Sequence, residues 1–205
     1  MDRAKLRLSE EEMDLISRAD WILTKNRLME RVGELLASLQ GEQWRCLQQL
    51  SNPLPAEVIK VPAKISRGEN YEGLPWMVLD LPRYFTNEHQ LAIRTLFWWG
   101  HGFSVTLVLK GRYQEMYCDN IYKNMGILQQ HQWYLCTSQD PWQHHFRSDN
   151  YTPLSSLHTD EIKTILTSHP FLKMAHFIPM ARWENVWELV MREYAMVGRS
   201  VVDDR

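Results

Sequence analysis

The feature that most constrains the fold is a pair of strand-like apolar runs around Gly100-His101-Gly102. The first run covers Leu91 to Trp99 and the second covers Phe103 to Lys110. Glycines on both sides of a short loop between two such runs are typical of a β-hairpin. The sequence therefore predicts an antiparallel hairpin near the middle of the chain.

Residue alternation divides this hairpin into two unlike faces. With Gly100-His101-Gly102 as the loop, we expect Trp99 to pair with Phe103 and Phe97 with Val105. One face is then apolar and carries Ile93, Phe97, Trp99, Phe103, Val105, Leu107 and Leu109. The other face is mixed and carries Arg94, Leu96, Trp98, Ser104, Thr106 and Val108. Because a one-residue slip would mix the two sets, the pattern selects this register and places the first face in the core.

Helical patterns flank the strand-rich region at both ends of the chain. Ser9 and Glu12 have the spacing of a capping box, which predicts a helix start. Apolar residues then recur at helical steps from Trp21 to Leu39, so we expect this stripe to pack on the sheet. A further helix is predicted from Thr159 to the residues before His169-Pro170. The final helix is predicted over 185–197, with Gly198 just after its end.

This order of elements predicts an α+β fold. We expect an antiparallel sheet of about four to six strands, covered by N-terminal helices and a C-terminal helix. The length of 205 residues fits a single domain spanning 1–205. It divides into a helical N-terminal segment (1–52), a strand-rich core (64–148) and a helix-rich C-terminal segment (158–205). Strands are also predicted at 76–81, 132–137 and 141–146, whereas 171–178 fits a strand or a helix.

Composition excludes several function classes. A net charge of −2 argues against a protein that binds nucleic acid through its phosphates. No apolar run is long enough to span a membrane, and the N-terminus lacks the apolar centre of a signal peptide. The three cysteines form no C-x-x-C motif, which favours reduced thiols. We therefore expect a soluble, cytoplasmic protein that binds neither nucleic acid nor a membrane.

A candidate binding site combines the polar loop 64–75 with the mixed face of the hairpin. The nine tryptophans suggest a bulky core, a stacking pocket, or both. A guanidinium beside an indole suits a planar anionic ligand. We predict that the protein binds a small polar or anionic ligand, without catalysis, as a regulatory module. The predicted ligand-binding residues are Arg67, Glu69, Asn70, Tyr71, Arg94 and Trp98.

Each part of this site also has a structural interpretation. Arg94 could form an ion pair with Asp80 on a neighbouring strand instead of facing a pocket. Trp98 is expected to be covered by the N-terminal helix, since a sheet that is apolar on both sides usually has helices on both sides. The loop could be a surface turn that holds a local ion pair between Arg67 and Glu69.

Two other function classes remain open. The first is an enzyme of unknown reaction that uses Glu69 with His101 or His144 as acid and base. The second is an interaction protein that forms a homodimer through exposed aromatic residues.

The pair His144-His145 does not predict a metal site, because neighbouring residues on a strand point to opposite faces and no further ligand has zinc spacing. No cofactor motif is present, and no residue is assigned as catalytic.

Three stretches of the chain resemble segments of uncharacterised bacterial proteins of similar length. They are Lys64-Ile65-Ser66-Arg67-Gly68-Glu69-Asn70-Tyr71, the positions Leu74-Pro75 and Asp80, and Arg94-Thr95-Leu96-Phe97-Trp98-Trp99-Gly100. The resemblance implies a bacterial, cytoplasmic origin. It implies no activity and carries no functional residues.

Overall fold

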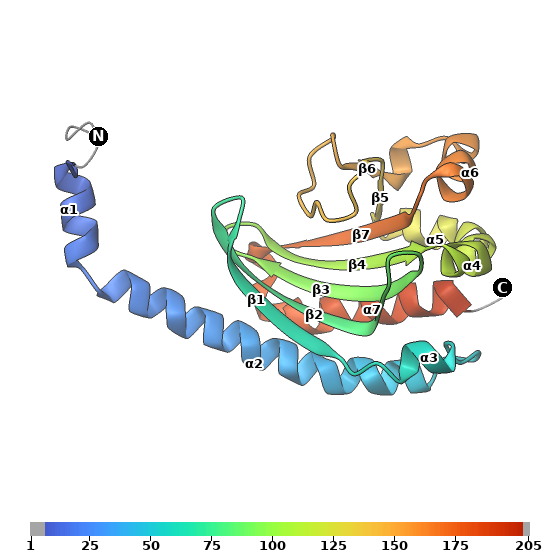
Figure 1. The fold of residues 1–205 in the computed structure, drawn as a ribbon, viewed down its shortest axis with the longest axis horizontal. Coiled ribbons are helices and arrows are strands. Elements are labelled where there is room, and N and C mark those ends of the chain that lie inside the picture. The colour runs from blue at the N-terminus through green and yellow to red at the C-terminus, as the bar shows by residue number, and fades with distance from the viewer. Residues whose placement is uncertain (1–6, 203–205) are drawn as a thin grey trace.

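The computed structural model describes residues 7–202 and has the predicted α+β class. Its seven strands form one antiparallel sheet in the order β1-β2-β3-β4-β7-β5-β6 (Figure 1). The strands are β1 (Lys64–Tyr71), β2 (Leu74–Phe85), β3 (Gln90–Trp98), β4 (Gly102–Lys110), β5 (Tyr134–Cys136), β6 (Tyr151–Pro153) and β7 (Leu172–Pro179). β5 confirms the strand predicted at 132–137, but the predicted loop 64–75 is mostly strand, because its polar residues form β1 and only the turn at residues 72–73 separates β1 from β2. The sheet exceeds the predicted four to six strands because the sequence predicts a loop where β1 forms and because β6 has only three residues, too few for alternation to reveal.

Helices lie at both ends of the chain, as predicted. They are α1 (Glu10–Ser17), α2 (Asp20–Gln48), α3 (Ala56–Ile59), α4 (Arg112–Lys123), α5 (Met125–Gln130), α6 (Thr159–Ser168) and α7 (Val186–Val202), with short 3-10 helices at Leu154–Ser156 and Met180–Asn185. The capping box of Ser9 and Glu12 is confirmed. α7 continues past Gly198, contrary to the prediction, because its last turn buries Val201 and Val202 in the core.

The helices α2 and α7 pack against one face of the sheet (Figure 1). This helix-covered face holds the main core, to which the strands contribute Ile93, Phe97, Phe103, Val105, Leu107 and Leu109. The polar exception Thr95 is fully buried, and its hydroxyl accepts a hydrogen bond of 2.9 Å from the Gln43 side chain on α2. The predicted division of the hairpin into an apolar and a mixed face is therefore confirmed.

The register of the hairpin differs from the prediction by two residues. Phe97 pairs with Phe103 and Trp98 with Gly102, so the loop is Trp99-Gly100-His101. Gly102 belongs to the strand because it lies against β7, where an added Cβ would come within 2.4 Å of the Ile178 carbonyl oxygen. Because the displacement is an even number of residues, every side chain keeps its predicted face.

The opposite face of the sheet is covered by a loop instead of helices. Residues 137–150 connect β5 to β6 and lie over this face (Figure 1). The predicted strand at 141–146 is part of this loop. Trp98 is buried on this loop-covered face, so the expectation that the N-terminal helix covers it is wrong: α2 packs against the other face.

Candidate functional site

Residues 137–150 form a long connection without helix or strand, which we call the covering loop. An antiparallel hairpin such as β5–β6 needs only roughly 2–5 connecting residues. Longer connections that have no secondary structure of their own commonly serve as binding loops or lids. The length of this loop therefore directs attention to the sheet face beneath it.

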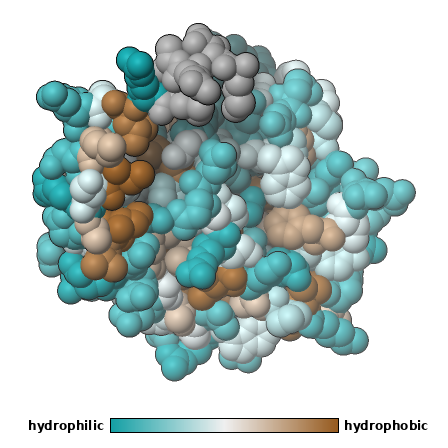
Figure 2. Space-filling view, turned by 60° about the vertical axis from the view of Figure 1, so that its left-hand side comes forward, coloured by the Kyte–Doolittle hydropathy of each residue, from teal (hydrophilic) through white to brown (hydrophobic). Residues whose placement is uncertain are grey.

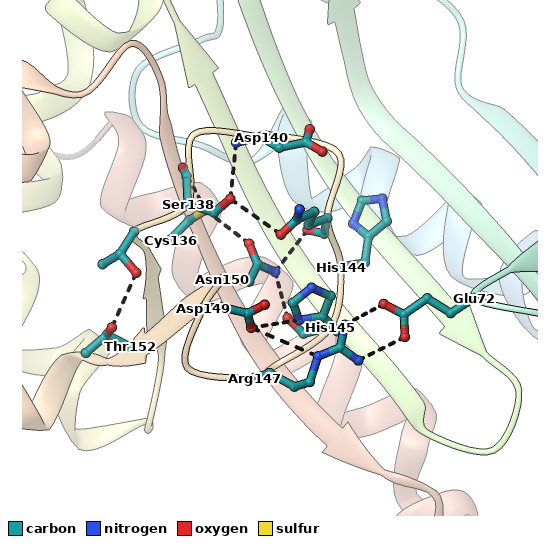
Figure 3. Close-up of polar contacts among 12 residues, drawn as sticks. Glu72, Cys136, Ser138, Asp140, His144, His145, Arg147, Asp149, Asn150 and Thr152 are labelled. Atoms are coloured by element: carbon teal, nitrogen blue, oxygen red, sulfur yellow. Dashed lines mark hydrogen bonds and ion pairs between the residues drawn. The ribbon is translucent and has the colours of Figure 1, made fainter.

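The covering loop has a fixed internal shape because Asn150 holds it from within (Figure 3). The fully buried Asn150 amide donates hydrogen bonds to the carbonyl oxygens of Gln143 at 3.2 Å and His145 at 2.6 Å. The Asn150 carbonyl accepts a hydrogen bond of 2.9 Å from the Thr137 amide. These bonds bring the two ends of the loop together, so the loop can act as one unit.

Two contacts fasten this unit to the turn between β1 and β2. The His144 amide donates a hydrogen bond of 2.7 Å to the Tyr71 hydroxyl. Arg147 forms a two-pronged ion pair with Glu72, with distances of 2.6 and 2.9 Å (Figure 3). These hydrogen bonds hold the pKa of Glu72 below its ordinary value. Because the ion pair is exposed to solvent, it is a weak fastening.

Beneath the loop, Arg94 and Asp80 form an ion pair between β3 and β2. They are register partners, and the Arg94 Nε lies 2.7 Å from the Asp80 carboxylate. Their side chains are 12% and 9% exposed. The Arg94 guanidinium also lies over the rings of Phe85 and Trp142, at 5.8 and 5.6 Å. The predicted ion pair is thus confirmed, and the charge of Arg94 is balanced by its partner.

A second cation on the same face has no carboxylate in direct contact, and only the more distant Asp140 acts on its charge. Lys173 on β7 is 1% exposed, and its ammonium donates a hydrogen bond to the Gln143 carbonyl of the covering loop. It lies 5.0 Å from the centre of the Tyr151 ring. Burial lowers the pKa of Lys173 to about 8, so the group remains mostly protonated at pH 7. Within residues 7–202, no carboxylate forms an ion pair with it.

Other polar groups beside Lys173 are buried and neutral. Burial raises the pKa of the Tyr151 hydroxyl well above its ordinary value, and it raises the pKa of the Cys136 thiol. Burial and the charges of Arg94 and Lys173 hold the pKa of His144 well below its ordinary value. The Tyr151 hydroxyl and the Nδ1 of His145 form no hydrogen bond among the described residues, although the Thr106 side chain acts on the hydroxyl and the Asp149 carboxylate lies 3.7 Å from the Nδ1. The site therefore offers polar atoms without a hydrogen bond close to a cation that no carboxylate contacts.

A small cavity of about 70 Å³ opens beside this polar cluster. The Trp98 indole stacks on His101 at 3.6 Å and donates a hydrogen bond of 3.2 Å to the Tyr71 carbonyl. The lining is mainly aromatic and consists of Leu96, Trp98, His101, Gly102, Phe103, Ser104, His144, Phe146 and Phe177. Such walls suit the apolar part of a ligand, while the polar cluster suits a charged group.

The structure divides the predicted binding residues between two places. Tyr71, Arg94 and Trp98 lie on the loop-covered face, as described above. Arg67 and Glu69 instead line a groove of about 600 Å³ between α2 and β1, on the side of the helices. Arg67 pairs with the core residue Met77 and so points to the face opposite that of Arg94. A single pocket that contains both arginines therefore does not form.

The structure also shows which contacts Glu69 and Asn70 make. Glu69 forms an ion pair with Lys25 of α2, and in the described part of the chain no hydrogen bond joins it to a histidine or to Arg67. The Asn70 side chain accepts a hydrogen bond of 3.1 Å from the Gly73 amide, which stabilises the β1–β2 turn. Asn70 thus has a structural contact, and Glu69 lies apart from His101 and His144.

Sequence patterns assigned Lys173, Tyr151 and Cys136 to no site, and they named His144 only as a possible acid–base partner of Glu69. Lys173 had a readable signal, because it is a single charge within the apolar run 171–178. His144 reaches the site because its segment is a loop, so the rule that neighbours on a strand diverge does not apply.

Among residues 7–202, no group of three or more histidines, cysteines and acids is placed to hold a metal.

No protein-family model, curated protein or solved structure matches the chain. None of the helices between residues 7 and 202 combines the length and the apolar character needed to cross a bilayer. The chemistry of the site's own residues is thus the basis for a function.

Proposed function

We propose that the protein binds a small monocarboxylate between the sheet and the covering loop. The observation that carries this proposal is the buried ammonium of Lys173, which forms no ion pair with a carboxylate among the described residues, Asp140 acting on it only from a longer distance. Burying a charge without an ion-pair partner lowers the stability of the folded state. Buried groups of this kind concentrate at functional sites. A bound anion would remove this cost.

The charge balance supports a monoanion. The positive charge of Arg94 is already matched by Asp80, which leaves one unmatched positive charge on Lys173. A carboxylate brings one negative charge and two acceptor oxygens. Lys173 would donate to one oxygen, and the Tyr151 hydroxyl, which forms no hydrogen bond within the described residues, would donate to the carboxylate as well. A dianion such as phosphate would leave a buried negative charge unmatched.

The shape of the site supports a ligand that enters when the covering loop lifts. The cavity of about 70 Å³ is far below the roughly 300–1,000 Å³ of ordinary ligand pockets. Phe146 of the loop stacks on Tyr151 at 4.8 Å and also packs on Phe177, so it fills the space between the cavity and Lys173. The Gln143 carbonyl occupies the position from which a carboxylate would contact the ammonium. Lifting the loop would free both places together.

A second candidate is a protein that forms an imine with a carbonyl compound through Lys173. It is favoured by the pKa of about 8, which leaves a fraction of neutral amine at pH 7. The amine nitrogen would attack the carbonyl carbon and release water. Borohydride would reduce that imine to a stable adduct on Lys173, whereas a carboxylate complex would give no adduct in a peptide mass spectrum.

Isothermal titration calorimetry with acetate, benzoate and phenylacetate tests the first proposal. We expect at least one of these to bind, and Lys173→Met to weaken it by about tenfold to a hundredfold, since a charged hydrogen bond contributes about 1.5–3 kcal/mol. Lys163→Met on α6 removes an exposed lysine and is the matched control. If none of these carboxylates binds, or if benzamide binds as tightly as benzoate, the proposal is wrong.

A further inference from the structure

The N-terminal arm, which we define as residues 7–28, extends beyond the sheet (Figure 1). It comprises α1 and the first turns of α2, and none of its residues is buried. The burial of α2 begins at Met29 and continues through Val32, Leu36, Leu39, Gln43 and Leu47. One helix is therefore packed along one part of its length and uncovered along the other.

The uncovered part carries the same apolar stripe as the packed part. Counting back from Met29 in helical steps gives Lys25, Ile22 and Trp21 on the stripe that meets the sheet further along. Ile22 and Trp21 are 36% and 46% exposed. The prediction that the stripe from Trp21 onward packs on the sheet is thus wrong for Trp21 and Ile22, which lie beyond the end of the sheet, whereas Lys25 already contacts Glu69 of β1.

α1 adds further exposed apolar side chains to the arm. Met13, Leu15 and Ile16 are 54%, 52% and 72% exposed, and Leu8 before the helix is 52% exposed. Figure 2 shows apolar side chains gathered beside the grey N-terminal residues. Contiguous exposed apolar surface of this kind marks an interaction site in a folded protein.

The charges of the arm indicate what covers it. α1 carries four acids, Glu10, Glu11, Glu12 and Asp14, and no lysine or arginine. Arg18 and Asp20 follow and pair with each other, and residues 25–31 then carry the exposed cations Arg27 and Arg31 with one acid, Glu30, while Lys25 is already paired with Glu69. If two arms lie antiparallel, the acidic α1 of each faces the basic stretch of the other. Such self-complementarity is what a two-fold symmetric interface requires.

We infer that the arm is the interface of a homodimer in which α1 of one copy packs against residues 25–31 of the other. The groove between α2 and β1 continues this surface with an apolar floor of Met29, Gly33 and Met77. Arg67 at its edge forms no ion pair within the described residues and adds a cation for the acidic α1. Methionine and arginine are both enriched at protein interfaces. The acidic α1 would be repelled by an anionic membrane.

Light scattering coupled to size exclusion tests this inference on the full chain at several concentrations. We expect the wild type to be a dimer, and the double variant Ile16→Glu/Ile22→Glu to be a monomer with unchanged far-UV circular dichroism. Ile127→Glu on α5 is the matched control, since Ile127 is 42% exposed but lies outside the arm. It should remain a dimer. A monomeric wild type overturns the inference, whether it stays free or binds phosphatidylcholine vesicles through the arm.

Charge exchange distinguishes a second copy from any other partner. Glu10→Lys/Glu11→Lys should raise the dimer dissociation constant by about tenfold or more, because like charges then face each other. Arg27→Glu/Arg31→Glu should have the same effect. The chain that carries all four changes should regain the wild-type dissociation constant, since the charges are complementary again. Failure of the fourfold variant to regain it overturns the antiparallel arrangement.

Discussion

The two faces of the sheet are made by the same strands and yet are built in opposite ways. The helix-covered face is apolar, and its buried Thr95 is bonded to Gln43 of the helix above. The loop-covered face buries an ion pair, an ammonium that no carboxylate contacts, and a tyrosine hydroxyl that forms no hydrogen bond within the described residues. One face therefore stabilises the fold, whereas the other keeps polar groups that packing alone would not select.

The elements that cover the two faces, helices on one and a loop on the other, explain how both faces can exist. A helix bonds its own carbonyl oxygens internally and therefore offers a sheet only side chains. The covering loop has free backbone groups, and it uses the Gln143 carbonyl to contact the ammonium of Lys173. The middle of a helix could not offer a carbonyl oxygen in this way, and a loop can also move aside more easily than a packed helix.

The largest effect should come from the helix-covered face. Leu107→Ala removes a fully buried side chain from the main core and should lower the free energy of unfolding by about 2–5 kcal/mol. Urea denaturation followed by circular dichroism measures it. The benzoate affinity of the folded variant should stay unchanged. A loss of affinity equal to that of Lys173→Met would mean that the two faces are not separate in function.

On the loop-covered face, removing a buried group should instead stabilise the protein. Lys173→Met replaces an unmatched ammonium by an apolar side chain of similar length, which should raise the free energy of unfolding by about 1–4 kcal/mol at pH 7. Urea denaturation of both proteins measures the difference, with Lys163→Met as the control. Lower stability of Lys173→Met would mean that the ammonium is well satisfied in place.

The same lysine predicts how stability depends on pH. Its pKa is about 8 in the folded chain, below the ordinary 10.5, so the unfolded chain binds more protons between these values. The wild type should therefore gain stability as pH rises from about 8 toward 10.5, whereas below pH 8 the full cost of the buried charge is present. Lys173→Met should lack this gain, and an equal gain in both proteins would contradict the assignment.

The smallest effect on stability should come from the fastening of the covering loop. Arg147→Ala removes the exposed ion pair with Glu72 and should leave the free energy of unfolding unchanged within error. It should nevertheless increase the association rate of benzoate in stopped-flow measurements, because the loop lifts more readily. An unchanged association rate would show that the loop does not gate the site.

The sequence predicted those features that depend on local periodicity. The two faces of β3 and β4, the pairing of Asp80 with Arg94 and the capping box of Ser9 all follow from spacing within a segment or between neighbouring strands. α4 escaped prediction because its buried Tyr113, Tyr117 and Ile121 lie among many polar residues.

The candidate site was less predictable because it joins distant segments. The contact between Lys173 and the carbonyl of Gln143 links a strand and a loop thirty residues apart in the chain, and no local pattern specifies it. The separation of Arg67 from Arg94 depends on the register between β1 and β2, which loop composition does not give. The end of the sheet beneath Ile22 likewise depends on tertiary structure alone.

The proposed carboxylate site is tested most directly by the pKa of the Lys173 ammonium, measured by side-chain NMR of the full chain with and without benzoate. We expect a pKa of about 8 without benzoate, and a higher pKa with it, because the carboxylate stabilises the charged form. Lys163→Met removes one exposed lysine signal and helps to assign the spectrum. A pKa near the ordinary 10.5, or one that benzoate does not raise, would contradict the proposed site.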